Sequence, residues 1–140
     1  MAAKDCYASQ DGPIGAECVV VDCIASGTIT INDAVLLTTA AADNDPRPTV
    51  KTSDANDSAA WYGVAAETVA TGKNVRITRF GRAKAKVTCS TPAIAVGEWV
   101  ASDDGGGVKK AASQTDRCKA RGQALQAAST QNDEILIDLT

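Results

Sequence analysis

The sequence contains no histidine in its 140 residues. Without an imidazole base, the Ser-His and Cys-His arrangements that activate most hydrolase nucleophiles are excluded. None of the five cysteines forms a Cys-x-x-Cys pair, so no zinc-binding pattern is present. The acidic turns Asp43–Asp45 and Asp54–Asp57 lack the glycine and distal glutamate of a calcium-binding loop. We therefore expect a non-enzymatic protein with no catalytic residue, no metal site and no cofactor.

Large apolar side chains are also scarce, since aromatic residues make up 4% of a chain that is 44% hydrophobic. Alanine supplies much of the apolar total. Hydrophobic stabilisation is about 25 cal/mol per Å² of apolar surface buried, so a core rich in alanine gains little per residue. We expect such a chain to gain stability by association with other subunits. It has no apolar run of membrane-spanning length, so we expect no membrane partner.

Charge is the next feature, and the formal net charge is −3. This balance makes general nucleic-acid binding an unexpected function. The stretch Lys73–Lys86 nevertheless holds six cations and no acid. Within it, Arg82, Lys84 and Lys86 alternate with small apolar residues, which predicts that they share one face of a strand. That face is either solvated and balanced by acids elsewhere, or a docking surface for an acidic patch on a partner.

The cysteines lie at five separate positions, and we expect no signal peptide from the N-terminal residues. An odd number of cysteines without a secretion signal favours synthesis in a reducing cytosol. We therefore expect five reduced thiols. The cysteines are Cys6, Cys18, Cys23, Cys89 and Cys118.

Alternation of apolar and polar residues predicts an all-β fold of short strands. The glycine in Phe80–Arg82 suggests either a hairpin or a sharp bend at that point. Prolines at 46 and 48 exclude a helix through the preceding loop. We expect strands at Cys18–Ile24, Thr28–Ile31, Val35–Leu37, Thr49–Thr52, Val75–Thr78, Ala83–Val87 and Glu134–Leu139.

A weak internal repeat organises these strands. Gly63–Val87 and Gly122–Leu139 share the order glycine, small apolar residues, polar turn and strand, at an offset of 59 to 60 residues. Ile29–Val35 recurs as Ile94–Val100, at an offset of 65. We expect a small barrel or sandwich built from two diverged β modules, at about 28–88 and 92–140.

The N-terminal residues are of mixed polarity and predict an extended arm. We expect residues 1–27 to form this arm and the first strand, and residues 28–140 to form a single β domain. Tyr7 and Ile14 are the arm's candidate contact residues.

Several short motifs lie along roughly 28–139, namely Tyr62–Ala65, Gly72–Ile77, Gly81, Ile94–Val100, Asp103–Gly105, Gly122–Leu125 and Ile135–Ile137. In this order they resemble the head decoration (cement) proteins of tailed phages. The resemblance implies a β-rich subunit that binds the outside of an icosahedral capsid, commonly as a homotrimer, and clamps neighbouring capsomers. It also implies the major capsid protein as partner, synthesis in the host cytoplasm and a final place on the virion surface.

On this reading, the candidate capsid or subunit interface is Tyr7, Ile14, Arg82, Lys84 and Lys86. Three alternatives stay open. The chain is a phage head-fibre or tail component, or a β-barrel module that binds a small ligand or glycan through exposed aromatics. The third alternative, an enzyme that uses a serine or an aspartate, has no motif to support it.

Overall fold

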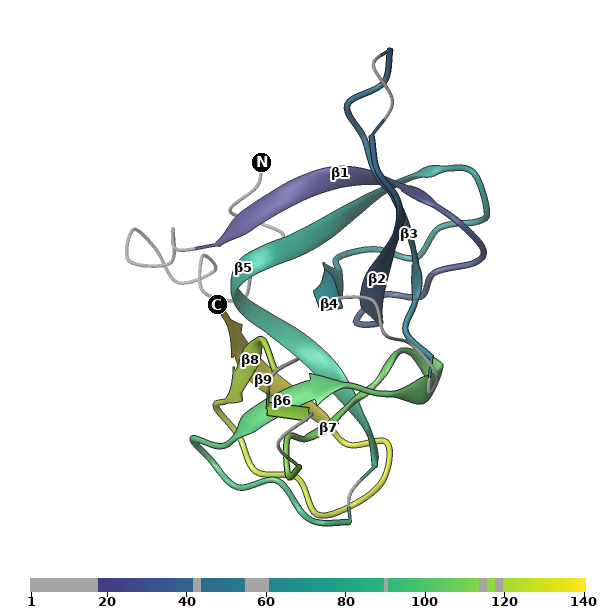
Figure 1. Ribbon diagram of the computed structural model, residues 1–140. Coiled ribbons are helices and arrows are strands. Elements are labelled where there is room, and N and C mark those ends of the chain that lie inside the picture. Colours follow the sequence, from purple (N-terminus) through teal and green to yellow (C-terminus); the bar gives the residue numbers. More distant parts are fainter. Residues whose placement is uncertain (1–17, 42–43, 55–60, 90, 114–115, 118–119) are drawn as a thin grey trace.

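The longest element of the protein is strand β5 (Asn74–Cys89), and two groups of strands form around it (Figure 1). The computed structural model describes residues 18–41, 44–54, 61–89, 91–113, 116–117 and 120–140. The other strands are β1 (Val19–Ala25), β2 (Ala34–Thr39), β3 (Thr49–Thr52), β4 (Trp61–Ala65), β6 (Trp99–Ser102), β7 (Val108–Lys110), β8 (Gly122–Ala124) and β9 (Glu134–Leu139). A 3-10 turn, η4 (Asp104–Gly106), lies between β6 and β7.

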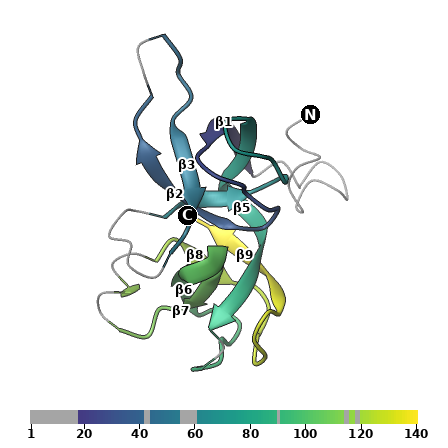
Figure 2. The ribbon, with the colours of Figure 1, turned by 90° about the vertical axis from the view of Figure 1, so that its right-hand side faces the viewer.

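Hydrogen bonding closes the strands into two rings that share β5. The first ring has the order β1-β3-β2-β4-β5, and pairing of β1 with β5 closes it. The second has the order β5-β7-β6-β8-β9, and pairing of β9 with β5 closes it. Figure 2 shows the two rings one above the other, with β5 running through both. The predicted all-β class is confirmed, and of barrel and sandwich the structure is a barrel.

Strand β5 passes from one ring to the other at Phe80 and Gly81. Phe80 pairs with Val19 of β1, whereas Gly81 pairs with Leu139 of β9. The strand continues through this point, so the hairpin expected there is wrong and the bend is confirmed (Figure 1). Gly81 has φ of +94°, a conformation that residues with a side chain rarely adopt, which explains the glycine at the bend.

The two rings repeat the same connectivity. In each, one pair of strands is parallel, β1 with β3 and β5 with β7, and the other pairs are antiparallel. Four turns of similar sequence carry a residue with positive φ at the same place, namely Asn32, Gly72, Gly97 and Asn132. The turns meet in pairs through isolated bridges, Ile29 with Val69 and Ile94 with Ala128.

These paired turns account for the offsets of the sequence repeat. The turn that follows Ala128 is one residue longer than the turn that follows Val69, so the offset rises from 59 to 60. The chain passes from the first ring to the second inside β5, whereas the predicted modules meet between residues 88 and 92. The division at residues 27 and 28 stays a prediction, because residues 1–17 lie outside the described part.

The strand expected at Thr28–Ile31 is wrong. Only Ile29 makes a bridge there, and the chain then turns. The turn is stabilised from within, since the Thr30 amide donates a hydrogen bond to Asp33 Oδ2 at 3.0 Å. A short acidic side chain that accepts from the backbone three residues earlier competes with strand pairing, which explains the difference.

Two hydrophobic clusters fill the structure. The first ring encloses one of them, which includes Ile29, Val35 and Ile77. The other fills the second ring and extends to Leu36, Trp61 and Val64 of β2 and β4. The first half of β2, Ala34–Leu36, and most of β4 are therefore buried on both faces, and Trp61 is only 1% exposed. Trp61 belongs to β4 of the first ring but packs in the cluster of the second, so one of the few aromatic residues links the two rings.

The cysteines depart from the prediction of five reduced thiols. Cys18 is disulfide-bonded. Cys6 and Cys118 lie outside the described residues, so the prediction for their thiols is not tested. Cys23 and Cys89 are free, and burial raises the pKa of the Cys23 thiol to about 11. The number of cysteines in a sequence does not report which sulfurs the fold brings together, so the prediction is wrong for Cys18.

Candidate functional site

The basic residues Arg82, Lys84 and Lys86 lie on the outer face of β5, as their spacing predicted. Arg82 is exposed and the two lysines are half-buried, while the alternate residues between Gly81 and Thr88 are buried. Tyr7 and Ile14, the other candidate interface residues, lie outside the described residues.

Acidic side chains of β9 lie directly beside this basic face. Arg82 is in register with Asp138, and Lys86 with Glu134. Lys84 Nζ lies 3.9 Å from Glu134 Oε1. Residues opposite one another on antiparallel strands share a face, so these acids neutralise much of the strand's charge. The arrangement favours the solvated face over the docking surface.

A second basic feature, which the sequence did not indicate, lies where the rings join. Arg121, just before β8, points its guanidinium at the main chain of β4, β5 and Thr140. Nε donates to Thr140 O at 3.1 Å, and Nη2 donates to Thr140 O at 2.9 Å and to Arg79 O at 2.6 Å. Nη1 donates to Trp61 O at 3.1 Å and to Tyr62 O. All five N–H groups of the side chain are thus used.

The strand geometry explains why those carbonyl oxygens need a donor. Strand β4 pairs with β5 only at Val64 and Ala65, because β5 then leaves for the second ring. The pairing of β1 with β5 skips Arg79, which makes that residue the extra one of a β-bulge. Arg121 donates to these carbonyl oxygens the hydrogen bonds that a neighbouring strand would donate in a regular sheet. Burial, and then the charge of Arg79, lower the pKa of Arg121.

The bulge also directs the Arg79 side chain across neighbouring aromatic rings. Its guanidinium carbon lies 4.0 Å from the centroid of Tyr62 and 5.2 Å from that of Phe80. Its Nη1 donates to Tyr62 O at 2.7 Å. Among the described residues, no aspartate or glutamate side chain lies within ion-pair distance of Arg79 or Arg121. Arg121 does contact the oxygen of Thr140, the last residue of the sequence.

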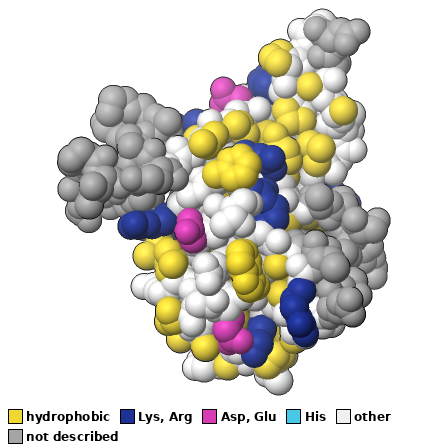
Figure 3. Space-filling model, turned by 60° about the vertical axis from the view of Figure 1, so that its left-hand side comes forward, with side chains coloured by type: hydrophobic (Ala, Val, Ile, Leu, Met, Phe, Trp, Pro, Cys, Tyr) yellow, Lys and Arg dark blue, Asp and Glu magenta, His cyan; other side chains and the backbone are white. Residues whose placement is uncertain are grey.

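Exposed apolar side chains accompany these arginines. Phe80 is 42% exposed and its register partner on β1, Val19, is 49% exposed. Figure 3 shows hydrophobic and basic side chains next to one another on one face of the molecule. We name Val19, Arg79 and Phe80 the junction surface, because they lie where β5 passes between the rings.

Trp99 lines a separate, open hollow of about 480 Å³ on the second ring. The indole is 45% exposed, and Lys110 Nζ forms an ion pair with Glu98 Oε2 beside it at 2.6 Å. Lys110, as the hydrogen-bond donor, lowers the pKa of Glu98. An exposed tryptophan beside polar groups is the feature that the alternative of a ligand- or glycan-binding module requires.

Other kinds of site are not evident in the part of the chain that the structure describes. No group of three or more metal-ligating side chains occurs among those residues. In the same residues, no helix has the length and apolar character needed to cross a bilayer.

Comparison with known proteins decides the family. The sequence profile of the phage cement proteins matches residues 14–139 of the chain. The chain belongs to the phage cement protein family. As a member of this family it is a structural protein of the phage particle, and the family implies a place on the capsid.

A solved structure shares the fold of this cement-family chain. It is described as the head fiber gp8.5 N base of bacteriophage phi29, and it aligns with a TM-score of 0.62 and 13% identity. The alignment covers 88% of this chain and 94% of that one. No curated protein matches the sequence.

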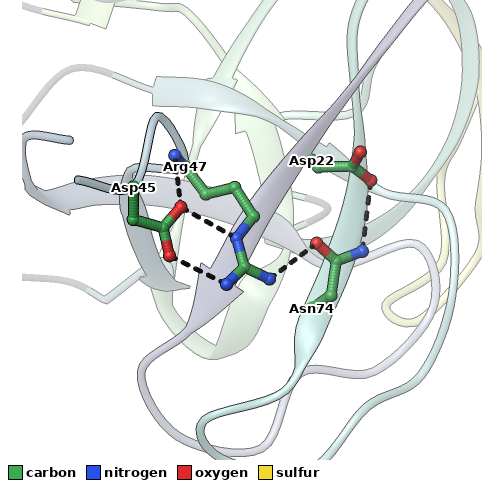
Figure 4. Close-up of polar contacts among 4 residues, drawn as sticks. All are labelled: Asp22, Asp45, Arg47 and Asn74. Atoms are coloured by element: carbon green, nitrogen blue, oxygen red, sulfur yellow. Dashed lines mark hydrogen bonds and ion pairs between the residues drawn. The ribbon is translucent and has the colours of Figure 1, made fainter. Parts of the chain in front are cut away.

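A polar network holds the loop between β2 and β3 against the first ring of this cement-family chain (Figure 4). Arg47 donates to Asp45 from Nε at 3.0 Å and from Nη2 at 2.8 Å. It also donates to Asn74 Oδ1 at 3.2 Å, and Asn74 donates to Asp22 Oδ1 at 3.1 Å. The loop is thereby tied to β1 and to the start of β5.

Replacing Arg47 with glutamine should raise the pKa of Asp45 towards its ordinary value of 3.8. In the native protein, hydrogen bonds from Arg47 hold that pKa at about 2. Because the folded-state pKa is lowered, the stabilisation is present above pH 3.8 and is lost as the pH falls towards 2. Carboxyl-carbon NMR titration measures the shift, with Arg82→Gln as the control. An unchanged Asp45 pKa in the Arg47→Gln protein would contradict this account.

Proposed function

We propose that this chain binds the outer surface of an icosahedral phage capsid and stabilises it by bridging neighbouring capsomers. It does so as a non-enzymatic structural subunit, and its partner is the major capsid protein. The chain is made in the host cytoplasm and assembles onto the virion. The observation that carries this proposal is the family match over residues 14–139.

The composition supports a subunit that functions in an assembly. A core with few large side chains gains from contacts with other subunits, and we propose a homotrimer. Analytical ultracentrifugation over a range of concentrations tests this state. A monomer at every concentration, and on the capsid, would count against the trimer.

The chain should bind saturably to capsids that lack it, and it should raise the temperature at which those capsids disrupt. A subunit that contacts two capsomers stabilises their association by mass action, in addition to occupying its own site. Co-sedimentation measures binding, and calorimetry of the decorated capsid measures disruption. Binding without any rise in the disruption temperature would show that the chain attaches but does not bridge.

The neighbouring fold of a head-fiber base favours a second candidate, the base of a head fibre. Cryo-electron microscopy of the native particle distinguishes the two. A bridging subunit lies across the boundaries between capsomers, whereas a fibre base supports a projecting shaft. Failure to find the chain on the particle would overturn both.

Neutralising the basic strand with Arg82→Gln, Lys84→Gln and Lys86→Gln should change capsid affinity less than about threefold. The acids Glu134 and Asp138 already lie beside these residues, and each exposed pair contributes only about 0–1 kcal/mol. Co-sedimentation at low and high salt makes the measurement, after a melting curve confirms folding. A large loss of affinity would support the docking hypothesis for this strand instead.

We also propose that the N-terminal arm contacts the capsid through Tyr7 and Ile14. Deleting residues 1–15 should weaken capsid binding while leaving both rings folded. If the deletion leaves binding and capsid stability unchanged, the arm has no such role.

A further inference from the structure

We propose that the junction surface, Val19, Arg79 and Phe80, contacts the shell and binds an acidic, partly apolar segment of the capsid protein. The inference rests on the proposed function and adds to it the face of the chain that is used. It also names the chemistry of the partner, which is a carboxylate next to an apolar side chain.

The apolar part of the surface is a pair of neighbouring side chains. Phe80 and Val19 are in register on antiparallel strands, and both are close to half exposed. Side chains opposite one another in this way lie about 4.5–5.5 Å apart at Cβ and form one continuous patch. The sequence contains a single phenylalanine, and the fold leaves it at the surface in a chain whose core has few large side chains. A partner that covers it gains the burial that the monomer lacks.

The charged part of the surface is a guanidinium held in a fixed orientation. Arg79 lies over the Tyr62 ring and donates to Tyr62 O, which limits its rotamers before any partner binds. That bond is the only one its guanidinium makes among the described residues, so several N–H groups remain for a ligand. An arginine fork that is already oriented suits a carboxylate, and arginine beside an aromatic ring is typical of binding hot spots.

The Arg79 guanidinium lacks an acidic side chain within ion-pair distance among the described residues. Arg121 adds a second positive charge nearby, and its own N–H groups are all occupied by main-chain oxygens. An acidic partner would therefore supply the counter-charge that Arg79 lacks among the described side chains. By contrast, ion pairs within 4.0 Å are made by Arg47, Lys51, Arg76, Lys84, Lys109 and Lys110.

The test compares matched variants in co-sedimentation with capsids that lack the chain. Arg79→Gln and Phe80→Ser should each weaken binding at least about tenfold, because hot-spot residues carry most of the binding energy. Their controls are Arg82→Gln, a neutralised arginine on the same strand, and Val96→Ser, an apolar residue 65% exposed on the second ring. Both controls should bind within about twofold of the wild type.

Two further measurements confirm that the surface acts through charge and shape. Raising the salt concentration should weaken the wild type more than Arg79→Gln, because the variant has lost the screened interaction. Arg79→Lys should restore little of the affinity, since lysine keeps the charge but not the planar fork. Melting curves establish folding, and if Arg79→Gln does not fold, Phe80→Ser and Arg79→Lys decide the outcome.

The outcomes separate this inference from the proposed function. If the wild type does not bind capsids, the proposed function is overturned and the inference with it. If the wild type binds and both junction variants bind equally well, only the inference is overturned. If the variants change the oligomeric state without capsids, the surface is an interface between copies of this chain, and its assignment to the capsid is wrong.

Discussion

Replacing Arg121 with methionine should lower the free energy of unfolding by about 3 kcal/mol. The substitution keeps much of the apolar stem and removes all five N–H donors. Main-chain oxygens of Trp61, Tyr62, Arg79 and Thr140 then lose their partner at the place where the rings join. An unsatisfied buried acceptor costs about 1–3 kcal/mol, and water recovers part of this because the side chain is half-buried. Urea denaturation measures the loss.

Two comparisons identify the cause. Arg117→Met removes a guanidinium that makes one bond among the described residues, to Ala112 O at 3.1 Å, so it should cost less than about 1 kcal/mol. Arg121→Lys keeps the charge but cannot reach four carbonyl oxygens, so it should recover less than half of the loss. A lysine variant as stable as the wild type would show that charge alone, and not the fork of donors, holds the junction.

The strands could be predicted because their signal is local. Alternation within a few residues marked Thr49–Thr52 and Glu134–Leu139 with the bounds that the structure has. The repeat was visible for the same reason, since its turns recur with similar residues at similar spacing. The parallel pairing of β1 with β3 and of β5 with β7 joins segments distant in sequence, and no local pattern reports it.

The basic stretch shows the limit of counting charges along the chain. The sequence presents Lys73–Lys86 as one positive segment, but the fold gives its members different environments. Arg76 Nε lies 2.7 Å from Glu67 Oε2, and the residues after Gly81 lie beside acids of β9. Arg79 alone is directed across aromatic rings by a bulge. The acids of β9 lie about fifty residues further along the chain, so they cannot be assigned to the cations of β5 until the pairing of β5 with β9 is known.

The role of Arg121 had a sequence signal, although a faint one. It precedes Gly122 at the position where the first module has Tyr62 before Gly63. A charged residue in place of an aromatic marks a departure from the repeat. Its purpose depends on carbonyl oxygens left free by the shared strand, and these exist only once β5 is known to belong to both rings.

The paired glycines of that repeat provide a matched test of packing. A Cβ on Gly63 would press against the Thr78 carbonyl oxygen and lie 2.7 Å from Ile77 Cγ2. The carbonyl belongs to β5, which pairs with β4 at the next residue, so it cannot move without disturbing the ladder. A Cβ on Gly122 would lie 3.1 Å from Val100 Cγ2 and 3.3 Å from Ile137 Cδ1, and these side-chain ends can shift by tenths of an ångström.

Gly63→Ala should therefore lower the free energy of unfolding by about 3 kcal/mol, and Gly122→Ala by about 1 kcal/mol. Neither glycine has a positive φ, so the difference reports space and not backbone strain. Urea denaturation of both proteins measures it, with crystal structures to show which atoms move. Equal losses of stability at the two positions would contradict the difference in packing around Gly63 and Gly122 that the structure shows.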